Sequence, residues 1–222
     1  MIDPKQPISR YFTWGEVLFS QTAARKGLDN TPTTDIAEGT NLYYTTTRFN
    51  NDFAIQTAAS EVSLAMRQAQ SFGVSSKQAQ TNSADFNKSY GIAFDLQNPK
   101  NLFIYSDTNG NRAYDGGVSC DGSDECREKS VLRSGISIQR VCADYMNGTQ
   151  TCFNGGARYL TLTYVRPNPE PVIKVFNSSN VEITGPWKTA YIELVSQNGT
   201  RIYVLTDYLS GQITIQSTPV IP

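Results

Sequence analysis

The sequence predicts an α+β fold, in which one N-terminal amphipathic helix packs on a mostly antiparallel β-sheet or sandwich. Two observations lead to this prediction. Apolar residues recur at helical spacing over residues 53–72, and after about residue 89 the pattern changes to alternation with a period of two. One helix followed by a run of strands is the element order of an α+β arrangement.

The helix is expected over residues 54–80. Glu61, Arg67 and Gln70 lie between its apolar residues, as expected for the solvent face of a helix packed on a sheet. The high alanine content favours a helix, and no proline occurs between Pro32 and Pro99. The apolar positions that define its buried face are Ile55, Ala58, Val62, Ala65, Ala69 and Phe72.

The β-rich head is expected over residues 88–216. Leu160, Leu162 and Tyr164 are predicted to share one face of a sheet. Asn198-Gly199 is a strong hairpin signal, because this dipeptide accepts the positive φ of a tight turn. The expected strands are 90–96, 101–105, 136–141, 159–165, 172–176, 190–195, 201–205 and 212–215.

Composition argues against several classes of function. The chain has 222 residues, a formal net charge of −1 and 18% charged residues, and no basic block suggests binding to nucleic acid. It has no histidine, which removes the usual general base, zinc ligand and pH switch. The carboxylates Asp121, Asp124, Glu125 and Glu128 are interpreted as a solvated surface rather than as acid/base residues. The chain is therefore predicted not to be an enzyme.

Four cysteines fall as two close pairs, Cys120 with Cys126 and Cys142 with Cys152. Each spacing lies in a loop containing Gly or Asn, so each pair could close a short disulfide loop. The alternative is a four-thiolate metal site, although spacings of six and ten residues are wider than the gaps typical of zinc ribbons. Disulfides are favoured, and they imply an oxidising compartment.

The sequence shows no stretch of ~20 apolar residues that would span a bilayer. It also shows no apolar core of a signal peptide behind Met1. Because disulfides imply export, we expect that the natural N-terminus has been replaced. Residues 1–53 are accordingly interpreted as a fused leader of separate origin, a short helix plus a linker, in front of a domain at 54–222.

Three blocks between residues 55 and 216 carry a resemblance to a known family. They are Arg67–Gly73 late in the helix, Tyr90–Phe94, and Phe103–Asn111 followed by Tyr114-Asp115. The closing residues Gly211–Ile215 continue it, and the whole stretch resembles type IV pilins and minor pseudopilins with a β-sandwich head. The resemblance implies a pilin-like fold and a role in a filament. The long apolar helix that opens a pilin is absent here.

The leader carries two shorter resemblances. Residues 10–32 are similar to the opening of phage-lysin peptidases of the D-Ala-D-Ala carboxypeptidase type, but those enzymes bind zinc through histidine. Residues 34–53 resemble a short element of phage tail-fibre proteins, which implies a homo-oligomer formed through the leader. A plain linker is the alternative for this second stretch.

A candidate calcium loop follows the predicted strand 101–105. Asp107, Asn109, Asn111 and Asp115 stand at relative positions 1, 3, 5 and 9, and the carbonyl of Ala113 would add a ligand. The twelfth position is Val118 rather than Glu, so the loop is not an EF-hand. The alternative is a turn rich in Asp and Asn whose side chains bond their own backbone.

Together these features predict a non-catalytic structural subunit of a type IV pilus or pseudopilus, serving filament assembly, adhesion, DNA uptake or secretion. Its expected partners are other pilin subunits or surface receptors, its location is extracellular, and its one possible cofactor is structural Ca²⁺. The alternative is a phage tail-fibre or receptor-binding module.

Overall fold

The structure, a computed structural model, describes residues 46–75, 88–120, 125–153, 157–218, and these belong to one compact unit, Thr45–Pro222. Residues 1–45 of the interpreted leader, the end of the predicted helix at residue 80, and Asp121 and Asp124 lie outside the described residues, whereas residues 46–53 are described and belong to a helix. In the part that is described, no helix has the length and hydropathy of a membrane span.

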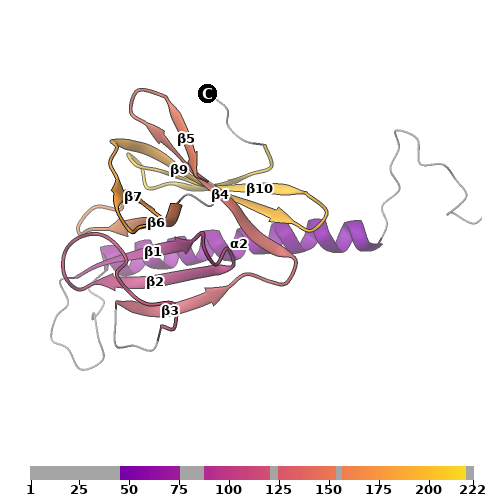
Figure 1. The fold of residues 1–222 in the computed structure, drawn as a ribbon, viewed down its shortest axis with the longest axis horizontal. Helices are drawn as coiled ribbons and strands as arrows, with labels where there is room; N and C mark the ends of the chain where they lie inside the picture. The colour runs from indigo at the N-terminus through magenta and orange to yellow at the C-terminus, as the bar shows by residue number, and fades with distance from the viewer. Residues whose placement is uncertain (1–45, 76–87, 121–124, 154–156, 219–222) are drawn as a thin grey trace, which may run out of the picture. The chain divides into compact units, whose positions relative to one another are not determined.

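The described residues form one helix and two antiparallel sheets (Figure 1). Helix α2 spans Thr46–Val74. One sheet, called sheet A, has the strand order β3-β2-β1-β6-β7-β8, and the other, sheet B, has the order β11-β10-β9-β4-β5. The strands are β1 (Ser89–Asp95), β2 (Asn101–Asp107), β3 (Cys126–Val131), β4 (Ile136–Tyr145), β5 (Gln150–Phe153), β6 (Ala157–Tyr164), β7 (Pro171–Asn177), β8 (Glu182–Ile183), β9 (Trp187–Ser196), β10 (Arg201–Asp207) and β11 (Ile213–Gln216).

The prediction of a pilin-like α+β fold is wrong, because strands in two sheets make up most of the regular structure and the described part has a single helix. The helix itself is as long as expected, but it begins at Thr46 rather than at residue 54, and the strands outweigh it. The 3.6-residue period of the helix is unbroken over many residues, whereas strands of two to ten residues each give a weak signal. The period of two also does not tell which sheet a strand joins, so the division into two sheets was not visible.

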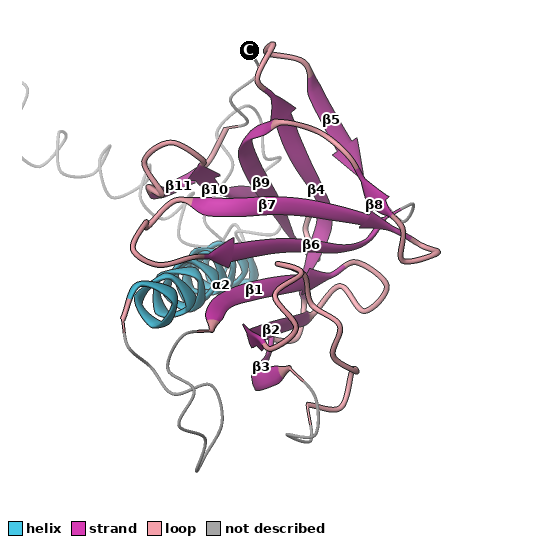
Figure 2. Ribbon diagram, turned by 90° about the vertical axis from the view of Figure 1, so that its left-hand side faces the viewer, coloured by secondary structure: helices cyan, strands magenta, loops and turns pink. Residues whose placement is uncertain are grey.

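Helix α2 buries one face against both sheets, in contact with β1 and β6 of sheet A and with β9, β10 and β11 of sheet B. In Figure 2 it is seen nearly end-on beside β1. Gly73 lets its last turn approach β6, because a Cβ there would come within 2.7 Å of the Tyr164 carbonyl oxygen. The buried side chains follow the predicted spacing: Ile55, Ala58, Ala59, Val62, Ala65, Met66 and Ala69.

The main core lies between the inner faces of the two sheets and the buried face of α2. Leu160, Leu162 and Tyr164 point into it together, which confirms the predicted shared face of β6. The Asn198-Gly199 hairpin is confirmed as well: it joins the antiparallel pair β9 and β10, and Gly199 has a φ of 82°.

Candidate functional site

The outer face of sheet A is covered by the residues that follow β2. We call residues 107–125 the covering loop; its positions 121–124 are not described. Tyr114 lies at the centre of the aromatic cluster beneath it, with its ring stacked on Phe103 at 5.1 Å and edge-on to Tyr159 at 5.6 Å, measured between centroids. The ring of Tyr105 lies 5.4 Å away. Tyr114 thus fastens the covering loop to the sheet through apolar contact.

Asp107 begins the covering loop at the end of β2, where it is buried. Its Oδ1 accepts the N–H of Gly110 at 2.8 Å and its Oδ2 accepts the N–H of Arg112 at 3.1 Å. The carbonyl of Arg112 in turn accepts the hydroxyl of Thr163 on β6 at 2.9 Å. A buried carboxylate with both oxygens bonded to backbone N–H groups shapes the turn.

The exposed tip of the covering loop contains the other predicted calcium ligands. Asn109 Oδ1 accepts the N–H of Asn111, and Asn111 Oδ1 accepts the N–H of Ala113. The side-chain amides of Asn109 and Asn111 both donate to Asp115 Oδ2. The structure therefore brings the predicted ligands into one loop, but most of their side-chain oxygens accept backbone N–H groups.

No group of three or more His, Cys, Asp or Glu in the described ranges is arranged to hold a metal ion. The hydrogen bonds of the covering loop match the alternative interpretation, a turn closed by its own Asp and Asn side chains. Calcium binding at Asp107, Asn109, Asn111, Ala113 and Asp115 stays a prediction.

Glu125 closes the covering loop, and sequence reasoning misjudged it. It was expected on a solvated surface, but only 5% of it is exposed. Its Oε1 accepts both the N–H and the hydroxyl of Thr108, at 2.9 and 3.1 Å, and its Oε2 accepts the N–H of Asp115 at 3.1 Å. Burial raises the pKa of Glu125 above its ordinary value, although these three donors act in the opposite direction. Glu128 is the exposed one: it accepts a hydrogen bond from Gln68 of α2.

Both predicted disulfides are present, Cys120–Cys126 and Cys142–Cys152, and they replace the alternative of a four-thiolate metal site. The first joins the covering loop to the start of β3, where Cys126 is buried in the aromatic cluster. The second joins residues that are already direct partners in the ladder of β4 and β5. The described residues hold no free cysteine.

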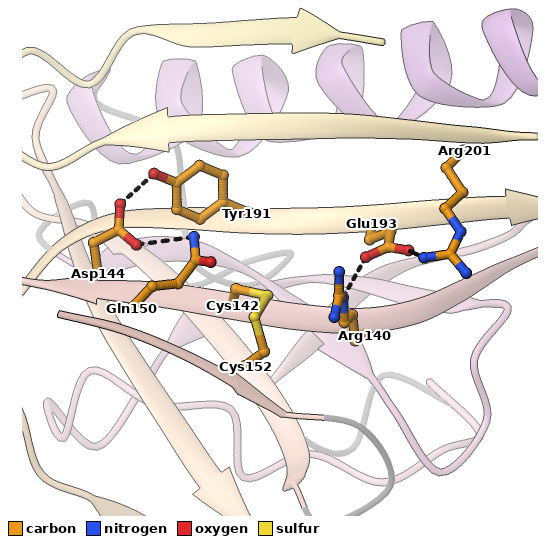
Figure 3. Close-up of a disulfide and its surroundings, with 8 residues drawn as sticks. All are labelled: Arg140, Cys142, Asp144, Gln150, Cys152, Tyr191, Glu193 and Arg201. Atoms are coloured by element: carbon orange, nitrogen blue, oxygen red, sulfur yellow. Dashed lines mark hydrogen bonds and ion pairs between the residues drawn. A yellow bond between two sulfur atoms is a disulfide. The ribbon is translucent and has the colours of Figure 1, made fainter. Parts of the chain in front are cut away.

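The outer face of sheet B contains two buried carboxylates that sequence analysis missed (Figure 3). Glu193 of β9 is 1% exposed and lies between two guanidinium groups: Arg201 is 2.9 Å away and Arg140 is in direct hydrogen-bond contact. Asp144 of β4 accepts hydrogen bonds from the hydroxyl of Tyr191 and from the side-chain amide of Gln150.

These carboxylates perturb their neighbours in a consistent way. The hydrogen bond to Glu193 raises the pKa of Arg140. Burial raises the pKa of Tyr191, and the adjacent Asp144 adds to this effect. The raised pKa values keep the guanidinium of Arg140 charged and the phenol of Tyr191 neutral. In these states both groups donate hydrogen bonds to a carboxylate.

A β-bulge brings Arg140 to Glu193. The register of β4 against β9 shifts between Ile138 and Arg140, so one extra residue turns Arg140 to the outer face while Ile138 stays in the core. The bulge has no signal in the sequence. The alternation of β9 could have placed Glu193 on the outer face, because Ile192 and Leu194 point inward.

No family model, no curated protein and no solved structure matches this chain.

Proposed function

We propose that the domain is the non-catalytic, extracellular head of a filament subunit of the type IV pilus or pseudopilus kind. The head in question is the domain of two antiparallel sheets and one helix described above. Its partners would be other subunits of the filament or surface receptors.

The observation that carries the proposal is that three of the residue blocks that resemble pilins contact one another, although they lie far apart in the sequence. From the block Arg67–Gly73, Gln70 donates to the carbonyl of Gly211 at 3.0 Å, and Arg67 lies 3.4 Å from the carbonyl oxygen of Ile213. Phe72 packs edge-on against Tyr90 of the second block, with centroids 5.7 Å apart. These contacts support the proposal by placing the resembling blocks at one junction between helix and sheets.

Two further features support the proposal. Disulfides persist in oxidising surroundings, as on a cell surface. The buried carboxylates Asp107, Glu125, Asp144 and Glu193 all have structural hydrogen-bond partners. These groups stabilise turns and sheet faces, which suits a domain that presents a surface.

The test is to locate the chain in the cells that encode it. Antibodies raised against the full chain should label surface filaments along their length and detect the chain in the sheared filament fraction. Deletion of its gene should change filament number, adhesion, DNA uptake or secretion. Labelling of purified phage particles, together with a stable trimer by light scattering, would instead favour a tail-fibre module and contradict the proposal.

A further inference from the structure

The Cys142–Cys152 disulfide lies at an open edge of sheet B (Figure 3). Strand β5, which contains Cys152, ends the strand order of this sheet, and no described strand pairs with its other side. Cys152 is exposed, whereas Cys142 on the neighbouring strand β4 is only 7% exposed. A reagent in solution can therefore approach this disulfide from the side of Cys152.

The Cys120–Cys126 disulfide is far less accessible. Cys126 is 1% exposed and lies in the aromatic cluster beneath the covering loop. Cys120 is partly buried and packs against the same cluster. A reagent reaches this bond only when the covering loop opens, so the two disulfides differ in what a collision from solvent can achieve.

The ladder of β4 and β5 does not need the disulfide for its backbone hydrogen bonds. Cys142 and Cys152 are direct partners, and at the end of this ladder the N–H of Tyr145 donates to the carbonyl of Thr149 at 2.8 Å. Hydrogen-bonded and non-hydrogen-bonded pairs alternate in an antiparallel ladder, which makes Cys142 and Cys152 a non-hydrogen-bonded pair. The backbone bonds belong to the neighbouring pairs, so they hold the two sulfur atoms opposite each other even when the disulfide is broken.

The charged groups beside the disulfide are balanced. Arg140 and Asp144 lie on either side of Cys142 along β4, and Glu193 lies between Arg140 and Arg201 (Figure 3). The two guanidinium groups and the two carboxylates together carry no net charge. An anionic reagent that approaches Cys152 is therefore not repelled by an excess of negative charge among these groups.

We propose that Cys152 is a site of reversible modification by low-molecular-mass thiols. The thiolate of such a compound attacks the Sγ atom of Cys152, and a new disulfide bond forms there as the Cys142–Cys152 bond breaks. Cys142 leaves as a thiolate and takes up a proton from water. One disulfide is exchanged for another, so no oxidant or reductant is needed. The proposal is independent of the filament role, because it rests on the accessibility of one bond in the folded domain.

The modification reverses by the same chemistry. The thiol of Cys142 stays opposite Cys152, held there by the ladder. When it loses its proton, it can attack the mixed disulfide at Cys152, release the small thiol and restore the original bond. The modified form therefore accumulates only while the small thiol is in excess, and a measurement must trap the freed Cys142.

The experiment treats the oxidised full chain with reduced glutathione and adds excess N-ethylmaleimide at timed intervals. Peptide mass spectrometry without reduction should find glutathione on Cys152 and the maleimide on Cys142. We expect this product to form at least tenfold faster than any adduct on Cys120 or Cys126, and to exceed glutathione on Cys142 at least tenfold. Absence of the adduct on Cys152, equal rates at the two disulfides, or glutathione mainly on Cys142 would overturn the proposal.

Urea distinguishes attack on the folded domain from attack on an opened chain. At urea concentrations below the unfolding transition, the rate at Cys152 should stay constant, because its sulfur is reached without opening. The rate at the Cys120–Cys126 bond should rise under the same conditions, since the covering loop must open first. A rate at Cys152 that rises as steeply would show that the folded domain is not the species that reacts, and would overturn the proposal.

A matched pair of variants tests whether the reagent arrives at this edge of sheet B. Gln150 precedes Cys152 by two residues on β5 and shares its face, whereas Gln216 lies on β11 at the opposite edge of the sheet. Gln150→Lys places a positive charge beside Cys152, which attracts a thiolate and should speed the formation of the adduct at least twofold. Gln216→Lys should leave the rate unchanged, and circular dichroism checks that both variants are folded. Equal rates in the two variants would contradict attack at Cys152.

Discussion

The outer faces of the two sheets are stabilised in different ways. On sheet A the side chains are covered by the described residues of the covering loop, which attach through Tyr114, Glu125 and the Cys120–Cys126 bond. On sheet B the buried groups Asp144 and Glu193 are held by residues of the neighbouring paired strands. One face therefore depends on a loop, and the other on the sheet itself.

This difference has a consequence for local stability. A loop held by a few side-chain contacts can open while the sheets stay paired, but groups bonded across a ladder separate only when the ladder unfolds. Perturbations of sheet A's cover should therefore appear first as local opening, and those of sheet B as a loss of global stability.

The largest effect is expected for Tyr114→Ala. It removes the ring that packs against Phe103, Tyr105 and Tyr159, which should cost about 3–4 kcal/mol of stability. Limited proteolysis should then cut within residues 107–125 before the domain unfolds. The control Tyr114→Phe keeps the ring and loses the hydrogen bond to the Gly117 carbonyl, about 1 kcal/mol. If both variants resist protease like the parent chain, Tyr114 does not fasten the loop.

The two disulfides should differ in how their loss is seen. Replacing both cysteines of either pair with serine should cost about 2–3 kcal/mol, because the closed chain segments are similarly short. Only removal of Cys120–Cys126 should expose the covering loop to protease, since Cys142 and Cys152 already face each other in a ladder. Denaturant unfolding and proteolysis of the two double variants check this. If the two double variants are cut equally fast by protease, the Cys120–Cys126 bond has no special role in holding the covering loop.

Glu193→Gln should destabilise sheet B by about 2 kcal/mol, because the neutral amide cannot satisfy Arg140 and Arg201 as a carboxylate does. The matched control is Glu182→Gln, whose partner Lys174 is 2.8 Å away at a much more accessible position. Exposed pairs contribute little, so the control should change stability by less than about 1 kcal/mol. Urea denaturation measures both, and equal losses would contradict the structural role of Glu193.

Calcium should raise the melting temperature if the ligands at 107–115 hold an ion. At ten times the dissociation constant, the added stability is about 1.4 kcal/mol. Asp115→Ala should abolish the increase, and Mg²⁺ at the same concentration serves as the control ion. A melting temperature that is the same in Ca²⁺ and in a chelator would assign these residues to the turn alone.

The smallest effect is a pH dependence from Glu125. Its pKa is raised on folding, so the unfolded chain binds fewer protons at this group than the folded chain in the window between the ordinary and the raised value. Glu125 therefore contributes stability at low pH that is lost as the pH rises through this window. Glu125→Gln should remove this pH-dependent contribution, and the control Glu128→Gln should retain it, when the free energy of unfolding is measured from pH 4 to 7. If Glu125→Gln has the same pH profile of stability as the parent chain, Glu125 makes no such contribution.

The strands that the sequence analysis missed are all at sheet edges. They are β3 and β8 at the two edges of sheet A, and β5 at one edge of sheet B. The residues of β3, Cys126–Val131, include Arg127, Glu128 and Lys129, which suits an edge facing water but gives no apolar alternation. Central strands such as β1 and β6 were found because both pack into the core.

The candidate site was predicted in part. The disulfide pairs followed from short spacing within loops, and the predicted ligands of residues 107–115 do share one loop. The burial of Glu125 was not visible, because it depends on Thr108 and Asp115 folding back over it from earlier in the chain. The contact of Arg140 with Glu193 was not visible either, because it depends on a bulge and on residues 53 positions apart.

The sequence by itself determined the features that depend on near neighbours: the buried face of α2, the inward face of β6, the turn at Asn198-Gly199 and the pairing of cysteines six and ten residues apart. These follow from backbone periodicity, turn conformation and short loop closure. Only the tertiary structure decided that the strands divide into two sheets, and that one outer face lies under a loop. Those outcomes depend on contacts between distant segments, whose free energy is not carried by any local pattern of residues.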